Sequence, residues 1–107
     1  MASDTFLYST LASDPELGEL VEMFVDEMPE RIAAFREAFE SGDSDAVARL
    51  AHQLKGSSGS YGFGQLTPPA AKLEAVAKQQ TPETEIVDAL KELLEMCGRI
   101  RAGSPES

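Results

Sequence analysis

The stretch AHQLKGSSGSYGFG, residues 51–64, is the most informative part of this sequence. It contains the only histidine of the 107-residue chain and four of its eight glycines. A glycine inside a helix costs about 1 kcal/mol relative to alanine. A helix that carries Gly56 and Gly59 close to His52 therefore needs a physical reason for them.

The helical periodicity of this stretch predicts that His52 faces solvent. Helical residues advance by about 100° each, so residues at three- and four-residue spacing share one side. The residues on the inward side are Val47, Leu50, Ala51, Leu54, Ser58 and Tyr61. His52 lies roughly 150° from the centre of that stripe. Gly56 and Gly59 follow on the His52 side, and Lys55 lies one turn on, at its flank. We expect an exposed imidazole with no side chains beyond it and one cation beside it.

An exposed helical histidine can be a simple surface residue, and that interpretation stays open here. The glycines favour a function, because an ordinary solvated face would carry Glu, Lys, Gln or Ala. Small neighbours around His52 suit close approach by another macromolecule, and Lys55 suits a negative group on the imidazole. A phosphoryl group brings nearly two negative charges and three acceptor oxygens. An ammonium group serves well as a point charge beside it.

The segment HQLKGSS at residues 52–58, followed by Gly62, resembles the signature of histidine phosphotransfer (HPt) domains. Those domains are the helical relay modules of two-component phosphorelays. The similarity extends over roughly residues 6–100. It includes Tyr8-Ser9, Asp14-Pro15-Glu16-Leu17, Leu20-Val21, Phe24, Pro29-Glu30-Arg31, Ser41-Gly42-Asp43 and Leu73-Glu74.

The resemblance implies a histidine-containing phosphotransfer protein. His52 would accept a phosphoryl group from a receiver-domain aspartate or a kinase and pass it to the receiver aspartate of a response regulator. Lys55 would stabilise the charge, and Glu74 on the next helix would bond the other ring nitrogen. A solvated Glu74 that pairs only with Lys78 is the alternative. The expected docking surface for the receiver consists of Arg49, Gln53, Gly56 and Gly59.

Other chemistry finds no support in the sequence. The chain has no Gly-rich phosphate loop after a strand and no nucleotide-binding pattern. We therefore expect that it has no ATP site and no autokinase activity, and that it is not an enzyme. One histidine facing water and one cysteine, Cys97, in an apolar stripe do not make a metal site. We expect no cofactor, and by resemblance Mg²⁺ only on the partner receiver domain.

The net charge of −10 and the pI of about 4.4 argue against nucleic acid and anionic membranes as partners. They also mean that two acidic proteins must meet, because receiver domains carry an acidic phosphorylation pocket. We expect Arg49 and Lys55 to make the field around His52 less negative. No apolar run approaches the roughly 20 residues of a membrane span, and residues 1–4 lack the pattern of a signal peptide. Together with a single cysteine, this favours the cytoplasm. We also expect a monomer.

Apolar stripes predict four helices, over about residues 15–40, 44–61, 67–79 and 82–101. Pro29 should kink or break the first of them. We expect an all-α, antiparallel up-down four-helix bundle over residues 6–101, with flexible ends at residues 1–5 and 102–107. Phe6, Leu7 and Leu11 predict a short extra N-terminal helix at one end of the core.

Two alternatives remain open at this stage. The chain can be a phosphotransfer domain taken from a larger hybrid or chemotaxis histidine kinase, although its start at Met1 favours a free-standing protein. It can also be a non-catalytic helical module that docks on a receiver or kinase. The presence of both His52 and Lys55 argues against that second alternative.

Overall fold

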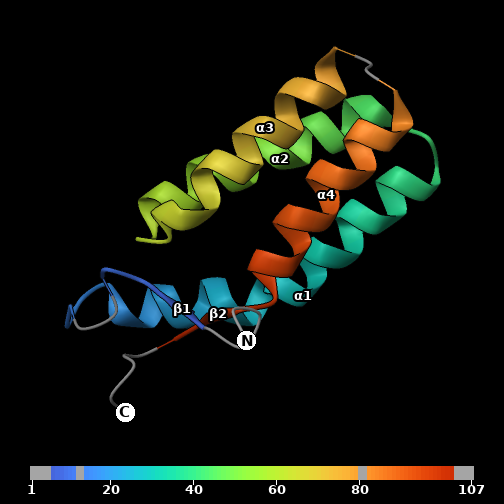
Figure 1. The fold of residues 1–107 in the computed structure, drawn as a ribbon. Helices are drawn as coiled ribbons and strands as arrows, with labels where there is room; N and C mark the ends of the chain where they lie inside the picture. Colours follow the sequence, from blue (N-terminus) through green and yellow to red (C-terminus); the bar gives the residue numbers. More distant parts are fainter. Residues whose placement is uncertain (1–5, 12–13, 80–81, 103–107) are drawn as a thin grey trace.

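Apolar residues at helical spacing bring four helices together around one core. The computed structural model describes residues 6–11, 14–79 and 82–102. The helices are α1 (Gly18–Glu40), α2 (Ser44–Ser60), α3 (Thr67–Lys78) and α4 (Glu83–Cys97), with a short 3-10 turn, η2 (Gly64–Leu66), between α2 and α3. Each helix runs antiparallel to the one before it (Figure 1). The predicted all-α four-helix bundle is confirmed.

Helix α1 continues through its internal proline. Pro29 has no N–H to donate to the carbonyl one turn earlier, which weakens the helix at that point without ending it. The helix changes direction between its blue N-terminal part and its teal C-terminal part (Figure 1). The kink is therefore the correct one of the two predicted outcomes. The N-terminal part lies under the bundle, and the C-terminal part runs along α4.

The turn before α2 sets where the helix that carries the histidine begins. Gly42 adopts a positive φ of 72°, a conformation in which glycine has no steric penalty. Asp43 then caps α2, since its Oδ1 accepts a hydrogen bond of 3.0 Å from the backbone N–H of Ala46.

One face of α2 packs into the core, chiefly against α3. Val47, Ala51, Leu54 and Ser58 on this face are almost fully buried, as the periodicity predicts. Leu50 and Tyr61, from the same stripe, are half-buried and pack at the margin of the core. The opposite face of α2, which carries His52, stays in solvent.

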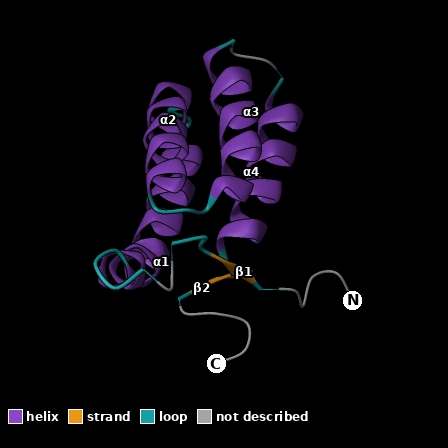
Figure 2. Ribbon diagram, turned by 90° about the vertical axis from the view of Figure 1, so that its left-hand side faces the viewer, coloured by secondary structure: helices purple, strands orange, loops and turns teal. Residues whose placement is uncertain are grey.

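The prediction of a short N-terminal helix is wrong. Leu7–Tyr8 forms a short strand, β1, that pairs in parallel with β2 (Ile100–Arg101), with Leu7 opposite Ile100 and Tyr8 opposite Arg101. This small sheet lies under the bundle, beside α1 (Figure 2). The backbone N–H of Leu7 donates to the carbonyl of Arg99 at 2.8 Å. A partner more than ninety positions away leaves no local pattern, and so the spacing of apolar residues was misleading.

The predicted flexible ends lie almost wholly outside the described residues, which begin at residue 6 and finish at residue 102. In the part of the chain that the structure describes, no helix is both long and apolar enough to cross a membrane.

Candidate functional site

His52 projects from the solvent face of α2. Its side chain is 65% exposed. A Cβ atom built on Gly56 or Gly59 would meet nothing within 4 Å, so open space extends along the helix from the ring. The structure therefore has the arrangement that the periodicity predicts, with an accessible imidazole and open space at the glycines one and two turns further on.

Helix α3 supplies the partner of the imidazole. Nδ1 of His52 lies 2.9 Å from Oε2 of Glu74, whose side chain is only 8% exposed. Glu74 reaches the ring because α2 and α3 pack closely along their length. Of the two interpretations of Glu74, the simple solvated glutamate does not fit its burial, although the expected pair with Lys78 does form.

Two lysines compensate the charge of Glu74. Lys55 Nζ lies 2.8 Å from Oε1, and Lys78 Nζ lies 3.0 Å from Oε2. Hydrogen bonds from Lys55 and Lys78 outweigh the opposing effect of desolvation, and with a further bond from His52 they lower the pKa of Glu74 from 4.5 to about 2. Glu74 is consequently a carboxylate at neutral pH.

The charge state of Glu74 fixes the tautomer of His52. A carboxylate only accepts hydrogen bonds, so the bond between the two side chains requires a proton on Nδ1. In a neutral imidazole with that proton, the lone pair is on Nε2. The site thus holds Nδ1 in place and turns the opposite edge of an exposed ring, with its nucleophilic nitrogen, toward solvent.

A shallow hollow of about 520 Å³ adjoins the ring. Its lining consists of His52, Gln53, Gly56, Ser57, Ser60 and Tyr61. Tyr61 is fixed at the end of α2 because its ring stacks on Phe24 of α1, with 5.2 Å between the ring centroids. Its carbonyl accepts a hydrogen bond from Ser9 Oγ. The hollow is therefore open to solvent, with Tyr61 held in place at one end of its lining.

The other residues predicted for the site are on the same helix. Arg49 and Gln53 are both exposed on α2, on the turns around His52. Sequence reasoning missed that Lys55 lies on Glu74, and it treated the contacts of Glu74 with His52 and with Lys78 as alternatives, whereas both form on Oε2.

The described residues outside this site offer neither a metal-binding cluster nor a reactive thiol. Within residues 6–11, 14–79 and 82–102, no group of three or more His, Cys, Asp or Glu residues is placed to hold a metal ion. Cys97 is buried, and desolvation raises the pKa of its thiol to about 12, which leaves it unreactive. The predicted buried cysteine is confirmed.

Comparison with protein families agrees with this geometry. A family model described as "Hpt domain" matches residues 19–103. The chain belongs to the Hpt domain family. Membership implies histidine phosphotransfer in a phosphorelay, and Hpt domains interact there with receiver domains and kinases. No curated protein and no solved structure matches the chain significantly.

Proposed function

We propose that this Hpt domain is a phosphorelay intermediary that carries the phosphoryl group on His52. The donor is a receiver-domain aspartate or a kinase, and the acceptor is the aspartate of a response-regulator receiver domain. The observation that supports this most strongly is the exposed imidazole whose Nδ1 is bonded to a buried carboxylate.

In the proposed transfer, the lone pair of Nε2 attacks the phosphorus of an aspartyl phosphate. The Nε2–P bond forms, the P–O bond to the aspartate breaks, and the aspartate leaves as a carboxylate. The ring keeps its proton on Nδ1 and gains a positive charge, which the carboxylate of Glu74 stabilises at 2.9 Å. Transfer to the next receiver reverses these steps, and the electron pair returns to Nε2.

The partner supplies what the described residues of this chain lack. Phosphoryl transfer depends mainly on alignment and on charge neutralisation. We assign Mg²⁺ and the reacting aspartate to the receiver, and the imidazole and the Lys55 ammonium to this protein. Docking would use the α2 surface formed by Arg49, Gln53, Gly56 and Gly59, whose two glycines leave room for the receiver.

We also propose an oligomeric state and a compartment for this protein. We propose a monomer, since one exposed imidazole and its α3 neighbours provide every group assigned to this protein. We propose the cytoplasm as its compartment, in keeping with the single, buried cysteine.

The test is incubation of the chain with phosphorylated receiver domains from its own source. Phosphoryl label should move to the chain, be acid-labile, and be absent from the His52→Gln variant. That variant should keep its fold, because the side chain is 65% exposed. Stable binding to receivers without any transfer of label would instead support a docking module and reject the relay function.

A further inference from the structure

The two oxygens of Glu74 have different partners. Oε1 accepts from Lys55 of α2 at 2.8 Å. Oε2 accepts from His52 at 2.9 Å and from Lys78 at 3.0 Å. Lys55 can therefore leave Oε1 without disturbing the bond that orients the imidazole.

A phosphoryl group on His52 would compete with Glu74 for Lys55. The group would be on Nε2, whereas Glu74 lies at Nδ1, on a different edge of the ring. It would bring nearly two negative charges. Lys55 lies one turn further along the same helix, and Arg49 lies one turn before His52. While the Lys55 ammonium is bonded to the carboxylate of Glu74, it does not also neutralise a phosphoryl group on Nε2, at the far edge of the ring.

Departure of Lys55 would leave the phosphorylated imidazole as the only partner of Glu74 from α2, and it would cost less if a lysine stayed on the carboxylate as well. The side chain of Glu74 is 8% exposed, and a carboxylate with so little access to water needs a charged partner. Lys78 provides one from the same helix, four residues along, where helix geometry places it beside Glu74.

We infer that Lys78 is a positioning residue that lets Lys55 move from Glu74 to the phosphoryl group while Glu74 stays on Nδ1 of His52. We call this exchange the lysine hand-over. It rests on the proposed phosphotransfer function and adds to it a role for a residue that does not touch the reacting atoms.

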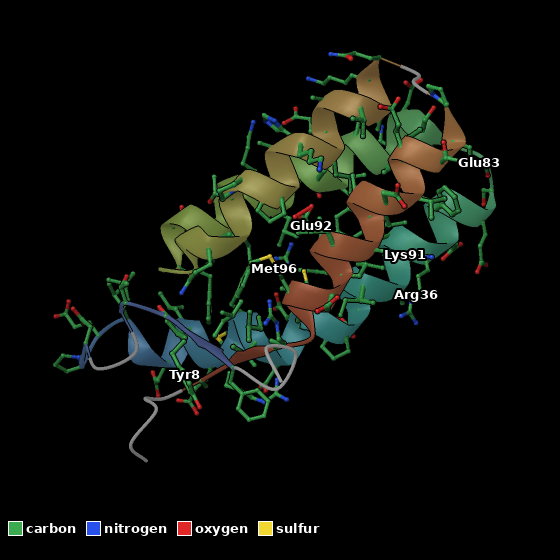
Figure 3. The ribbon with its side chains drawn as sticks, viewed as in Figure 1. Tyr8, Arg36, Glu83, Lys91, Glu92 and Met96 are labelled. Atoms are coloured by element: carbon green, nitrogen blue, oxygen red, sulfur yellow. The ribbon has the colours of Figure 1, made fainter. Side chains whose placement is uncertain are left out.

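The contact of Lys78 differs from an ordinary surface ion pair. Pairs between exposed side chains contribute little, and the pair of Lys72 with Glu92, at 3.7 Å and with both side chains more than half exposed, is of that kind. Glu92 projects from α4 on the side that faces α3 (Figure 3). Lys78 is also exposed at 65%, yet its partner Glu74 is buried. Lys72 is consequently a matched control on the same helix.

Both lysines line an open hollow beside Glu74. A hollow of about 490 Å³ between α2 and α3 is lined by Lys55, Ala71, Glu74, Ala75, Lys78 and Gln79. Its other lining residues are small or neutral, so the charged groups that face Glu74 there are Lys55 and Lys78, with His52 from α2. Movement of either lysine within this hollow would displace no bulky side chain.

The experiment uses the full chain phosphorylated with potassium phosphoramidate, which needs no protein partner. In that reaction the Nε2–P bond forms, the P–N bond of the reagent breaks, and ammonia leaves. The pH titration of phosphorylated His52 is then followed by ³¹P NMR. A nearby cation lowers the midpoint, whether the ring or the phosphoryl oxygens take the proton.

The hand-over predicts a dependence between the two lysines. Lys55→Gln should raise the midpoint, because the cation on the phosphoryl group is lost. Lys78→Gln should also raise it, by about half a pH unit or more, because Lys55 then stays on Glu74. In the Lys55→Gln background, Lys78→Gln should add less than about 0.2 unit. Lys72→Gln should leave the midpoint unchanged, and Lys78→Arg should restore it.

Two results would overturn the inference. If the Lys78→Gln variant titrates with the same midpoint as the unchanged chain, Lys78 has no positioning role and is an ordinary surface residue. A shift of equal size with and without Lys55 would mean that Lys78 acts directly through its own field. Since transfer from a receiver is a separate assay, failure of the proposed function can be told apart from failure of the hand-over.

Discussion

Gly56 and Gly62 belong to the same glycine-rich stretch but are needed for opposite physical reasons. Gly56 is helical and would have open space around a Cβ atom. Gly62 has a φ of 80°, and a Cβ atom built on it would overlap Ser9 Oγ. The first glycine leaves open space that the proposed docking would use, and the second allows the chain to turn under a packed segment. The comparison separates what the stretch does for function from what it does for the fold.

The largest effect on stability is expected for Gly62→Ala. A left-handed backbone costs about 1–2 kcal/mol for a residue with a Cβ atom, and Ser9 and the backbone of Thr10, 3.0 Å away, would also have to shift. Denaturant unfolding should show this loss, while phosphotransfer by the folded fraction is retained. Gly64→Ala is the matched control, because that glycine has neither a positive φ nor a neighbour within 4 Å of a Cβ. Equal stability of the two variants would contradict the account of Gly62.

The opposite pattern is expected for Gly56→Gln. Glutamine favours a helix over glycine by less than about 1 kcal/mol, so the fold should be kept or slightly stabilised. A long side chain at the docking surface should slow transfer from a receiver about tenfold, because overpacking an interface costs about 1–3 kcal/mol. The rate of label transfer is the measurement, with Gly56→Ala as the smaller change. An unchanged rate of transfer in Gly56→Gln would show that the receiver does not need the open space at Gly56.

The smallest effect concerns how Glu74 stabilises the site at different pH values. Because its pKa in the folded protein is about 2, below the ordinary 4.5, its contribution to stability is complete above pH 4.5 and is lost as the pH falls toward 2. The difference in melting temperature between the unchanged chain and Glu74→Gln should therefore shrink between pH 6 and pH 2.5.

The exposed Glu92 provides the control for that titration. Its side chain is 52% exposed and 3.7 Å from Lys72, so Glu92→Gln makes the same charge change without a buried carboxylate. A pH dependence as large in Glu92→Gln as in Glu74→Gln would show that net charge, and not the contacts of Glu74, causes the effect.

The sequence predicted whatever depends on neighbours along one helix. Three- and four-residue spacing was enough to place Leu54 and Ser58 inside and His52 outside. It failed for Leu7–Tyr8, where pairing with Ile100–Arg101 near the other end of the chain overrides the local apolar pattern.

The candidate site shows the same division. The orientation of His52 follows from periodicity on α2, and the pair of Glu74 with Lys78 follows from spacing on α3. The contacts between these helices depend on how α2 packs against α3, which no spacing specifies. The bond between His52 and Glu74 was expected only from family resemblance, and the position of Lys55 on Glu74 was not expected.

We expect Glu74 to hold Nδ1 of His52 and to leave Nε2 as the nitrogen that carries the phosphoryl group. The chain has one histidine, so a ¹⁵N NMR spectrum of the imidazole reports this site alone. The spectrum should show a proton on Nδ1 in the free protein and coupling of phosphorus to Nε2 after transfer from a phosphorylated receiver. A phosphoryl group on Nδ1, or a free protein with its proton on Nε2, would contradict the account.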